Sequence, residues 1–166
     1  FFIDTAYTDK TTNDPTGIIA TCKVGNDLYI THGQKVHMKF PDLLRFIPSY
    51  VETHGYTSRS SIRIEPKANG LSVIDQLKES TGLNVTKTPT PKESKETRLN
   101  AVSPIVECGR VILVDGVWTE GFIEEVCGFP SKPHDEYVDV LCYAIGHHLG
   151  HSSRAIDRES IARMVF

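Results

Sequence analysis

The order of the apolar segments is the feature that most constrains the fold of this chain. Strand-like patterns come first: residues 1–7 form a short apolar run, and residues 16–24 and 28–39 alternate well enough to form a hairpin turned at residues 25–27. After these three antiparallel strands, helical and strand-like segments alternate, and a helix closes the pattern. This order predicts an α/β domain with a mixed central sheet flanked by helices.

The later segments have helical spacing or short apolar runs. The predicted helices cover residues 41–51, 71–82, 97–107, 119–129 and 134–148, and the predicted strands cover 61–65, 83–86 and 110–114. We expect Pro48 to distort the first helix without ending it, and Thr119 to cap the fourth. Residues 88–95 are polar and contain two prolines, which predicts a mobile loop.

Carboxylates stand at the ends of two buried strands and at the start of the last helix. Asp4 and Glu65 end strands, whereas Asp135, Glu136 and Asp139 lie three or four residues apart and can share a helix face. Crowded carboxylates repel one another and must take up protons or bind cations. Divalent ions such as Mg²⁺ take oxygen ligands, and two ions about 3.5 to 4 Å apart can clamp the oxygens of a phosphodiester. The pattern therefore predicts a two-metal nuclease site.

Each of these residues also has a simpler explanation when it is considered alone. Asp4 could form a turn, and Glu65 could form a salt bridge with Arg63 or Lys67. Asp135 and Glu136 would favour a helix N-terminus through its dipole. That explanation does not extend to Asp139, which lies among apolar residues.

Length and charge limit the classes of protein to consider. The 166 residues fit one domain, with no apolar run long enough to span a membrane and no secretory signal, so we expect a soluble intracellular protein. The chain begins without Met inside an apparent core strand, so we expect it to be part of a longer protein. A net charge of -3 is unusual for a free-standing nucleic-acid binder and favours a weak binder that a partner delivers to DNA.

The four cysteines lack the spacing of zinc ligands. They are Cys22, Cys108, Cys127 and Cys142. Each lies in an apolar segment, so reduced and buried thiols are expected, and neither zinc nor disulfides are indicated.

Four segments carry more specific motifs: DTAYT (residues 4–8), IEPKANGLSVIDQL (64–77), KETRLNAVSPIVECGRVILVDG (95–116) and HDEYVDVLCYAI (134–145). These segments resemble the C-terminal nuclease domain of tailed-phage terminase large subunits, over nearly the whole chain. The order of the elements is similarly the ribonuclease H-like order, in which metal ligands come from the first strand, the fourth strand and a late helix. This link to a fold is an analogy.

The resemblance assigns residues to the family's motifs. Asp4 matches a first-strand Asp, and Glu65 matches an acidic residue on the fourth strand. An HDDxxDAL-like helix is matched by His134, Asp135, Glu136, Asp139 and Leu141. Glu136 stands where this pattern more often has Asp, and its longer side chain leaves open which of the helix carboxylates contacts metal.

The resemblance implies metal-dependent hydrolysis of double-stranded DNA during viral genome packaging. Asp4 would bridge two Mg²⁺ or Mn²⁺ ions, Glu65 would hold one, and Asp139 with Asp135 or Glu136 would hold the other. The implied partners are a terminase ATPase domain in cis, the small terminase subunit and the portal protein, in the cytoplasm of a bacterial host and without a membrane. The sequence itself contains no GxxxxGK[ST] motif of such an ATPase.

Basic residues near these motifs are candidates for DNA or phosphate contact: Lys67, Lys92, Lys95 and Arg98. A run of solvated surface charge is the alternative. Two rival functions also fit the pattern. One is a junction resolvase of the RuvC type, and the other is a catalytically silent docking module of a packaging motor.

Overall fold

The computed structural model describes residues 1–6, 10, 14–67 and 70–150. The strands are β1 (Phe2–Asp4), β2 (Thr16–Val24), β3 (Asp27–Val36), β4 (Ile62–Ile64), β5 (Val85–Lys87) and β6 (Val111–Leu113). The helices are α1 (Phe40–Thr53), α2 (Gly70–Ser80), α3 (Lys95–Glu107), α4 (Thr119–Gly128) and α5 (Glu136–His148). None of the helices in the described ranges is long and apolar enough to cross a membrane.

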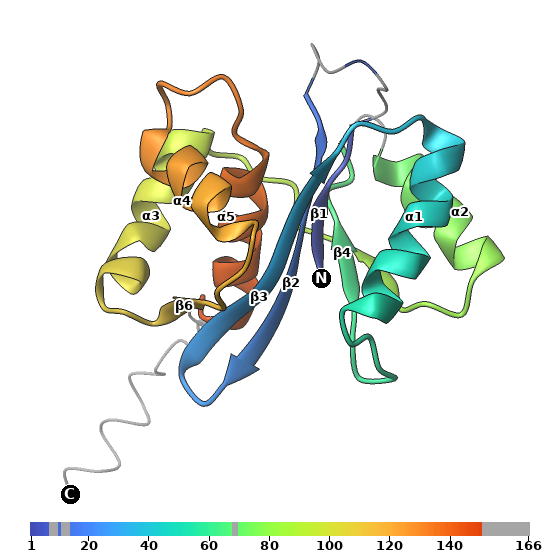
Figure 1. Ribbon diagram of the computed structural model, residues 1–166, viewed down its shortest axis with the longest axis horizontal. Coiled ribbons are helices and arrows are strands. Elements are labelled where there is room, and N and C mark those ends of the chain that lie inside the picture. The colour runs from blue at the N-terminus through green and yellow to red at the C-terminus, as the bar shows by residue number, and fades with distance from the viewer. Residues whose placement is uncertain (7–9, 11–13, 68–69, 151–166) are drawn as a thin grey trace, which may run out of the picture.

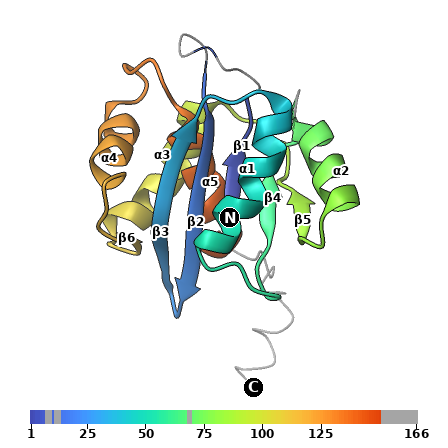
Figure 2. The same ribbon diagram turned by 45° about the vertical axis from the view of Figure 1, so that its right-hand side comes forward.

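The strands form one mixed sheet in the order β5-β4-β1-β2-β3-β6 (Figure 2). The first three strands pair antiparallel, as predicted. β4 lies parallel to β1, β5 parallel to β4, and β6 parallel to β3. β6 lies at one edge of the sheet. The α/β class and the mixed sheet expected from the sequence are therefore correct.

Helices cover both faces of the sheet (Figure 1). Helices α1 and α2 lie on one side, and α3, α4 and α5 lie on the other. Neighbouring residues on a strand point to opposite faces, so Ile3 packs in the core under α1 and α2, whereas Phe2 packs in the core under α5. Ile18 and Ile19 on β2 divide in the same way. β1 and the first half of β2 are consequently buried on both faces.

Strand β1 is shorter than the predicted range of residues 1–7. The Thr16 hydroxyl donates to the Ala6 carbonyl at 2.8 Å and accepts from the Ala6 amide at 2.9 Å. A side chain therefore satisfies the backbone groups that strand pairing would otherwise use, and β1 ends at Asp4. Tyr7, the last residue of the predicted strand, lies outside the described residues, as do residues 68–69 of the KANG segment.

Several helix starts differ from the predicted ones. The prediction that Thr119 caps α4 is wrong, because Trp118 occupies the capping position and the Thr119 hydroxyl is buried without a hydrogen-bond partner among the described residues. Ser94 caps α3 by accepting from the Thr97 amide at 3.1 Å, so this helix begins before residue 97. Pro48 lies inside α1 and does not end it, as expected.

The prediction that all four cysteines are buried is also wrong. Only Cys142 is buried, whereas Cys22, Cys108 and Cys127 are exposed. The local apolar sequence around each thiol misled the prediction. Cys22 lies in the outer half of β2, where the strand extends to solvent, and Cys108 follows the last residue of α3.

Candidate metal centre

Two of the predicted carboxylates lie at the same edge of the sheet. Asp4 is the last residue of β1, and Glu65 directly follows β4, the parallel neighbour of β1. The Glu65 amide donates to the carbonyl of Ile3 at 3.2 Å, which fixes the end of one strand against the other. Parallel strands end on the same side, so the two carboxylates come from adjacent, rigid backbone segments.

The third carboxylate comes from the first turn of α5. Asp139 is 1 % exposed and Glu65 is 3 % exposed, whereas Asp4 is half-buried. One carboxylate oxygen from each of the three residues lies within 4.8 Å of the others. Residues that are 61 and 74 positions apart in the sequence thus converge into one group of oxygen donors.

Burial and like charge perturb this group strongly. Burial, together with the neighbouring carboxylates of Asp139 and Glu65, raises the pKa of Asp4 to about 8. A carboxylate whose ionised form is disfavoured in this way gains most from a nearby cation. The electrostatics of the cluster therefore favour the binding of a positive ion.

Basic side chains surround the cluster. Lys67 Nζ lies 2.7 Å from Glu65 Oε1, Lys95 Nζ lies 2.6 Å from Asp139 Oδ2, and Arg98 Nη2 lies 2.6 Å from Asp139 Oδ1. Burial lowers the pKa of Lys95, but hydrogen bonds and charge from Asp135 and Asp139 outweigh it and raise that pKa overall. Lys95 and Arg98 are therefore part of the acidic centre, and the alternative of a solvated surface run does not describe them. Lys92 lines a separate pocket.

The two remaining carboxylates at the start of α5, Asp135 and Glu136, have different neighbours. Asp135 is half-buried, with Oδ1 2.5 Å from Lys95 Nζ. Glu136 is buried, and one of its oxygens lies within 4.8 Å of ligand atoms of Asp14 and His134. A small pocket of about 180 Å³ is lined by Asp4, Asp14, Lys95, Asp135 and Glu136, so the two acidic groups adjoin one another.

Several residues that contribute to these surroundings were not predicted from the sequence. Asp14 lies in the loop before β2. Glu125 of α4 accepts from the Tyr137 amide at 2.6 Å and pairs with Lys35, which lies 3.8 Å from Glu136. These contacts join elements that are distant in the sequence, so no local pattern indicated them. His134 could be identified from the sequence, because it directly precedes Asp135 and Glu136.

The donor set fits a hard divalent cation. All three groups of the Asp4 cluster offer carboxylate oxygens, which are the ligands that Mg²⁺ and Mn²⁺ prefer. Glu65 Oε1 and Asp139 Oδ1 are buried and accept no well-aligned hydrogen bond within the described part of the chain, although each has a cation beside it. Buried oxygens with such incomplete hydrogen bonding are suited to coordinate an ion.

Solved structures with a similar fold are terminase nucleases of viruses. The large terminase nuclease of thermophilic phage G20c with bound zinc has a TM-score of 0.57 at 18% identity, covering 81% of this chain and 82% of that chain. The nuclease domain of the large terminase of bacteriophage SPP1 with bound Mn has a TM-score of 0.57 at 15% identity, covering 87% and 83%. The Mn-soaked, inhibitor-bound terminase nuclease domain of human cytomegalovirus has a TM-score of 0.60 at 15% identity, covering 93% and 83%.

These likenesses establish a shared fold at low sequence identity. No curated protein sequence matches the chain. A family model of the terminase RNaseH-like domain matches residues 2–148, which include β1, β4, α5 and the three clustered carboxylates. The chain therefore belongs to the terminase RNaseH-like domain family.

Proposed function

We propose that this domain is a divalent-metal-dependent endodeoxyribonuclease that cuts concatemeric double-stranded DNA during viral genome packaging. The observation that carries the proposal is the convergence of carboxylate oxygens from Asp4, Glu65 and Asp139 within 4.8 Å. Membership in the terminase family and the metal-bound relatives support it.

The chain's own residues would divide the work as follows. Asp4 has a carboxylate oxygen within 4.8 Å of both Glu65 and Asp139, and it would bridge two Mg²⁺ or Mn²⁺ ions. Glu65 would hold one ion, and Asp139 with Asp135 or Glu136 would hold the other. Two such ions, when bound, activate a water nucleophile and stabilise the leaving 3′ oxygen of the phosphodiester. No protein nucleophile is then needed.

Lys95 would change partners when the site is loaded. Its ammonium group lies 2.5 Å from Asp135 and 2.6 Å from Asp139. There it neutralises carboxylate charge that bound metal ions would neutralise in the loaded site. A cation at these carboxylates weakens that ion pair and leaves Lys95 free to contact a phosphate. Lys67 beside Glu65 would contact phosphate in the same way.

We also propose that the domain acts as the nuclease half of a longer terminase chain, with its ATPase domain in cis. The small terminase subunit and the portal protein would be its packaging partners, in the cytoplasm of a bacterial host. Its net charge of -3 fits a nuclease that relies on a motor to deliver DNA.

A plasmid assay tests the proposed activity. The purified domain is incubated with supercoiled DNA and Mn²⁺ or Mg²⁺, beside the Asp4→Asn and Asp139→Asn variants. We expect slow, sequence-indifferent nicking and linearisation by the parent alone. Each substitution replaces a charged ligand carboxylate with a neutral amide, which weakens metal binding. Equal cutting by all three proteins, or no cutting by the parent with either ion, would contradict the proposal.

A further inference from the structure

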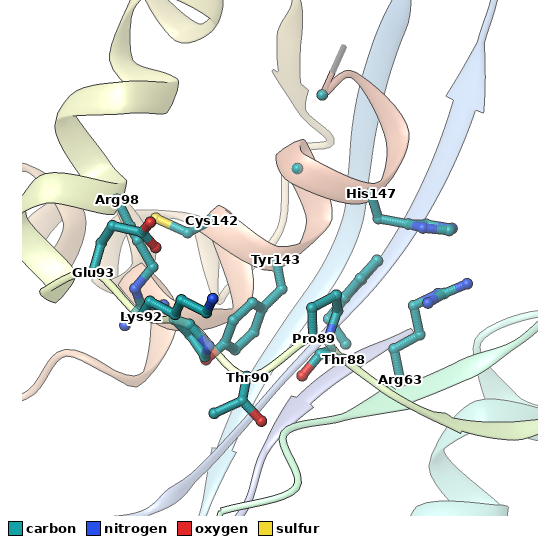
Figure 3. Close-up of a pocket in the computed structure, with 14 residues that line it drawn as sticks. Arg63, Thr88, Pro89, Thr90, Lys92, Glu93, Arg98, Cys142, Tyr143 and His147 are labelled. Atoms are coloured by element: carbon teal, nitrogen blue, oxygen red, sulfur yellow. The ribbon is translucent and has the colours of Figure 1, made fainter. Parts of the chain in front are cut away.

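A second, larger pocket lies next to the metal centre. Its volume is about 690 Å³, and it lies between strands β1 and β4, the loop that precedes α3, and the second half of α5. In the view of Figure 3, Arg63 and His147 stand on one side of Tyr143, and Lys92 and Arg98 stand on the other. Arg98 also contacts Asp139 at 2.6 Å, so the pocket and the metal centre share a wall.

Arg63 places positive charge on one side of this pocket, and Glu93, the acid that lines the pocket, lies on the other side with Lys92 and Arg98. Arg63 lies between Ile62 and Ile64 on β4, so its side chain faces α5 while theirs face α1 and α2. Its Nε atom is buried without a hydrogen-bond partner, and within the described ranges the side chain forms no ion pair. Burial lowers the pKa of His147 and of the Phe1 amino group, and Arg63 lowers both further. Both groups therefore favour their neutral forms, and the positive charge on this side of the pocket comes from Arg63.

Two further residues with buried donors line the same pocket. Nε and Nη1 of Arg98 are buried without a hydrogen-bond partner among the described residues. The Tyr143 hydroxyl is buried without a well-aligned partner there, and burial and the nearby Glu65 carboxylate raise its pKa. A guanidinium group can only donate hydrogen bonds, so its natural ligand carries acceptor oxygens. Unsatisfied buried donors are uncommon in folded proteins, and several around one pocket indicate an anionic, oxygen-rich ligand.

The other walls offer flat and apolar surfaces. Tyr143 is half-buried with its ring against the pocket, and Pro89 and Pro91 lie in the loop that borders it. The guanidinium of Arg98 lies 5.4 Å from the centre of the Tyr143 ring, which helps to hold the ring in place. Aromatic rings beside a basic groove are the combination that binds single-stranded nucleic acid.

We propose that this pocket holds one unpaired nucleotide of the DNA strand whose neighbouring phosphodiester lies at Asp4, Glu65 and Asp139. Arg63 binds its phosphate, and its base lies against Tyr143. The pocket volume of about 690 Å³ is that of a small-ligand site. A B-form duplex, whose major groove alone is about 12 Å wide, is too wide to enter it, so a single strand is the occupant. This proposal rests on the proposed nuclease function for the identity of the strand.

Binding of a short fluorescent oligothymidylate, measured by anisotropy in EDTA, tests the pocket without metal or cleavage. We expect Arg63→Gln to weaken binding by about tenfold, because one charge-assisted phosphate contact is lost. Arg59→Gln is the matched control, since Arg59 is an exposed arginine outside the pocket, and it should bind as the parent does. Tyr143→Leu should weaken binding, whereas Tyr143→Phe should retain the stacking.

Other readouts separate the possible failures. Calorimetric Mn²⁺ affinity should be the same in Arg63→Gln and the parent, and thermal melting checks that the variant folds. If Arg63→Gln does not fold, Lys92→Gln replaces it in the test, because Lys92 is exposed and lines the pocket. This substitution should lower the affinity for oligothymidylate a few-fold. If the parent cuts no plasmid but binds the oligothymidylate, and Arg63→Gln weakens that binding, the pocket is supported and the nuclease proposal is contradicted.

Three outcomes would overturn the pocket proposal. One is equal oligothymidylate affinity in Arg63→Gln and Arg59→Gln. Another is tighter binding of duplex than of single-stranded DNA in EDTA. The third is competition by inorganic phosphate at the same affinity as the oligonucleotide, which would identify a simple anion site.

Discussion

At the residue scale, Asp4 makes the metal centre sensitive to pH. Its pKa is raised from 3.8 to about 8, first by burial and then by Asp139 and Glu65. In metal-free protein the folded state therefore keeps a proton that the unfolded chain releases. Stability is greatest below a pH of about 4 for this group, and it falls as pH rises toward about 8. Melting curves across this range should show the decline, and Asp4→Asn should flatten it.

Metal binding should show the opposite pH dependence, because the ion needs the ionised carboxylate. We expect Mn²⁺ affinity to increase with pH up to about 8, by at most about tenfold per pH unit if one proton is displaced. Calorimetry in two buffers with different ionisation enthalpies measures the released proton. An affinity that is constant between mildly acidic and mildly basic pH would argue against Asp4 as a ligand.

Lys95 gives a second prediction at this scale. Its ion pairs with Asp135 and Asp139 stabilise the metal-free protein, so Lys95→Met should lower the free energy of unfolding by about 1–3 kcal/mol. The same substitution should tighten Mn²⁺ binding, because the ion no longer competes with the ammonium group. Denaturant melts and calorimetry test both effects, with exposed Lys78→Met on α2 as the control. Unchanged or weaker Mn²⁺ affinity in Lys95→Met would contradict the competition.

At the element scale, the sequence patterns predicted the strands, the helices and the positions of Asp4 and Glu65. Alternation and apolar spacing are local properties, and they were sufficient for the sheet and for α5. The surroundings of Asp139 were not predictable in the same way. Lys95 and Arg98 reach it because α3 packs beside α5, and α3 has no buried residue of its own that would reveal this packing.

The end of β1 shows how one side chain can hold an element in place. Thr16 bonds both backbone groups of Ala6, two residues after Asp4, and it is 1 % exposed. Thr16→Val keeps the shape but leaves these groups unpaired, so we expect a loss of about 1–3 kcal/mol in stability. Mn²⁺ affinity should also fall, because Asp4 is held less firmly.

Thr31→Val is the matched control for this element. Thr31 is exposed on β3 and donates to the Ala20 carbonyl at 3.2 Å, and it is distant in sequence from Asp4, Glu65 and Asp139. Stability and Mn²⁺ affinity should therefore change little in Thr31→Val. If Thr16→Val lowers stability but leaves Mn²⁺ affinity at the parent value, Asp4 is positioned by the strand pairing alone.

At the scale of the whole molecule, we expect charge rather than shape to limit the affinity for DNA. The chain carries a net charge of -3, and its buried carboxylates gather at the proposed cutting site. This arrangement repels phosphate until cations are bound. We expect weak duplex binding in EDTA and a gain of about tenfold, equal to about 1.4 kcal/mol, when Ca²⁺ is added, measured by anisotropy at fixed ionic strength.

Asp139→Asn separates the effect of charge from a general effect of salt. Because it removes one negative charge from the centre and one ligand for the ion, it should bind duplex DNA more tightly than the parent in EDTA and gain less from Ca²⁺. Asp75→Asn, on α2 and outside both pockets, should behave as the parent in both conditions. A Ca²⁺ gain of the same size in all three proteins would mean that the ion acts on the DNA or on the general surface, and that the carboxylates do not limit DNA binding.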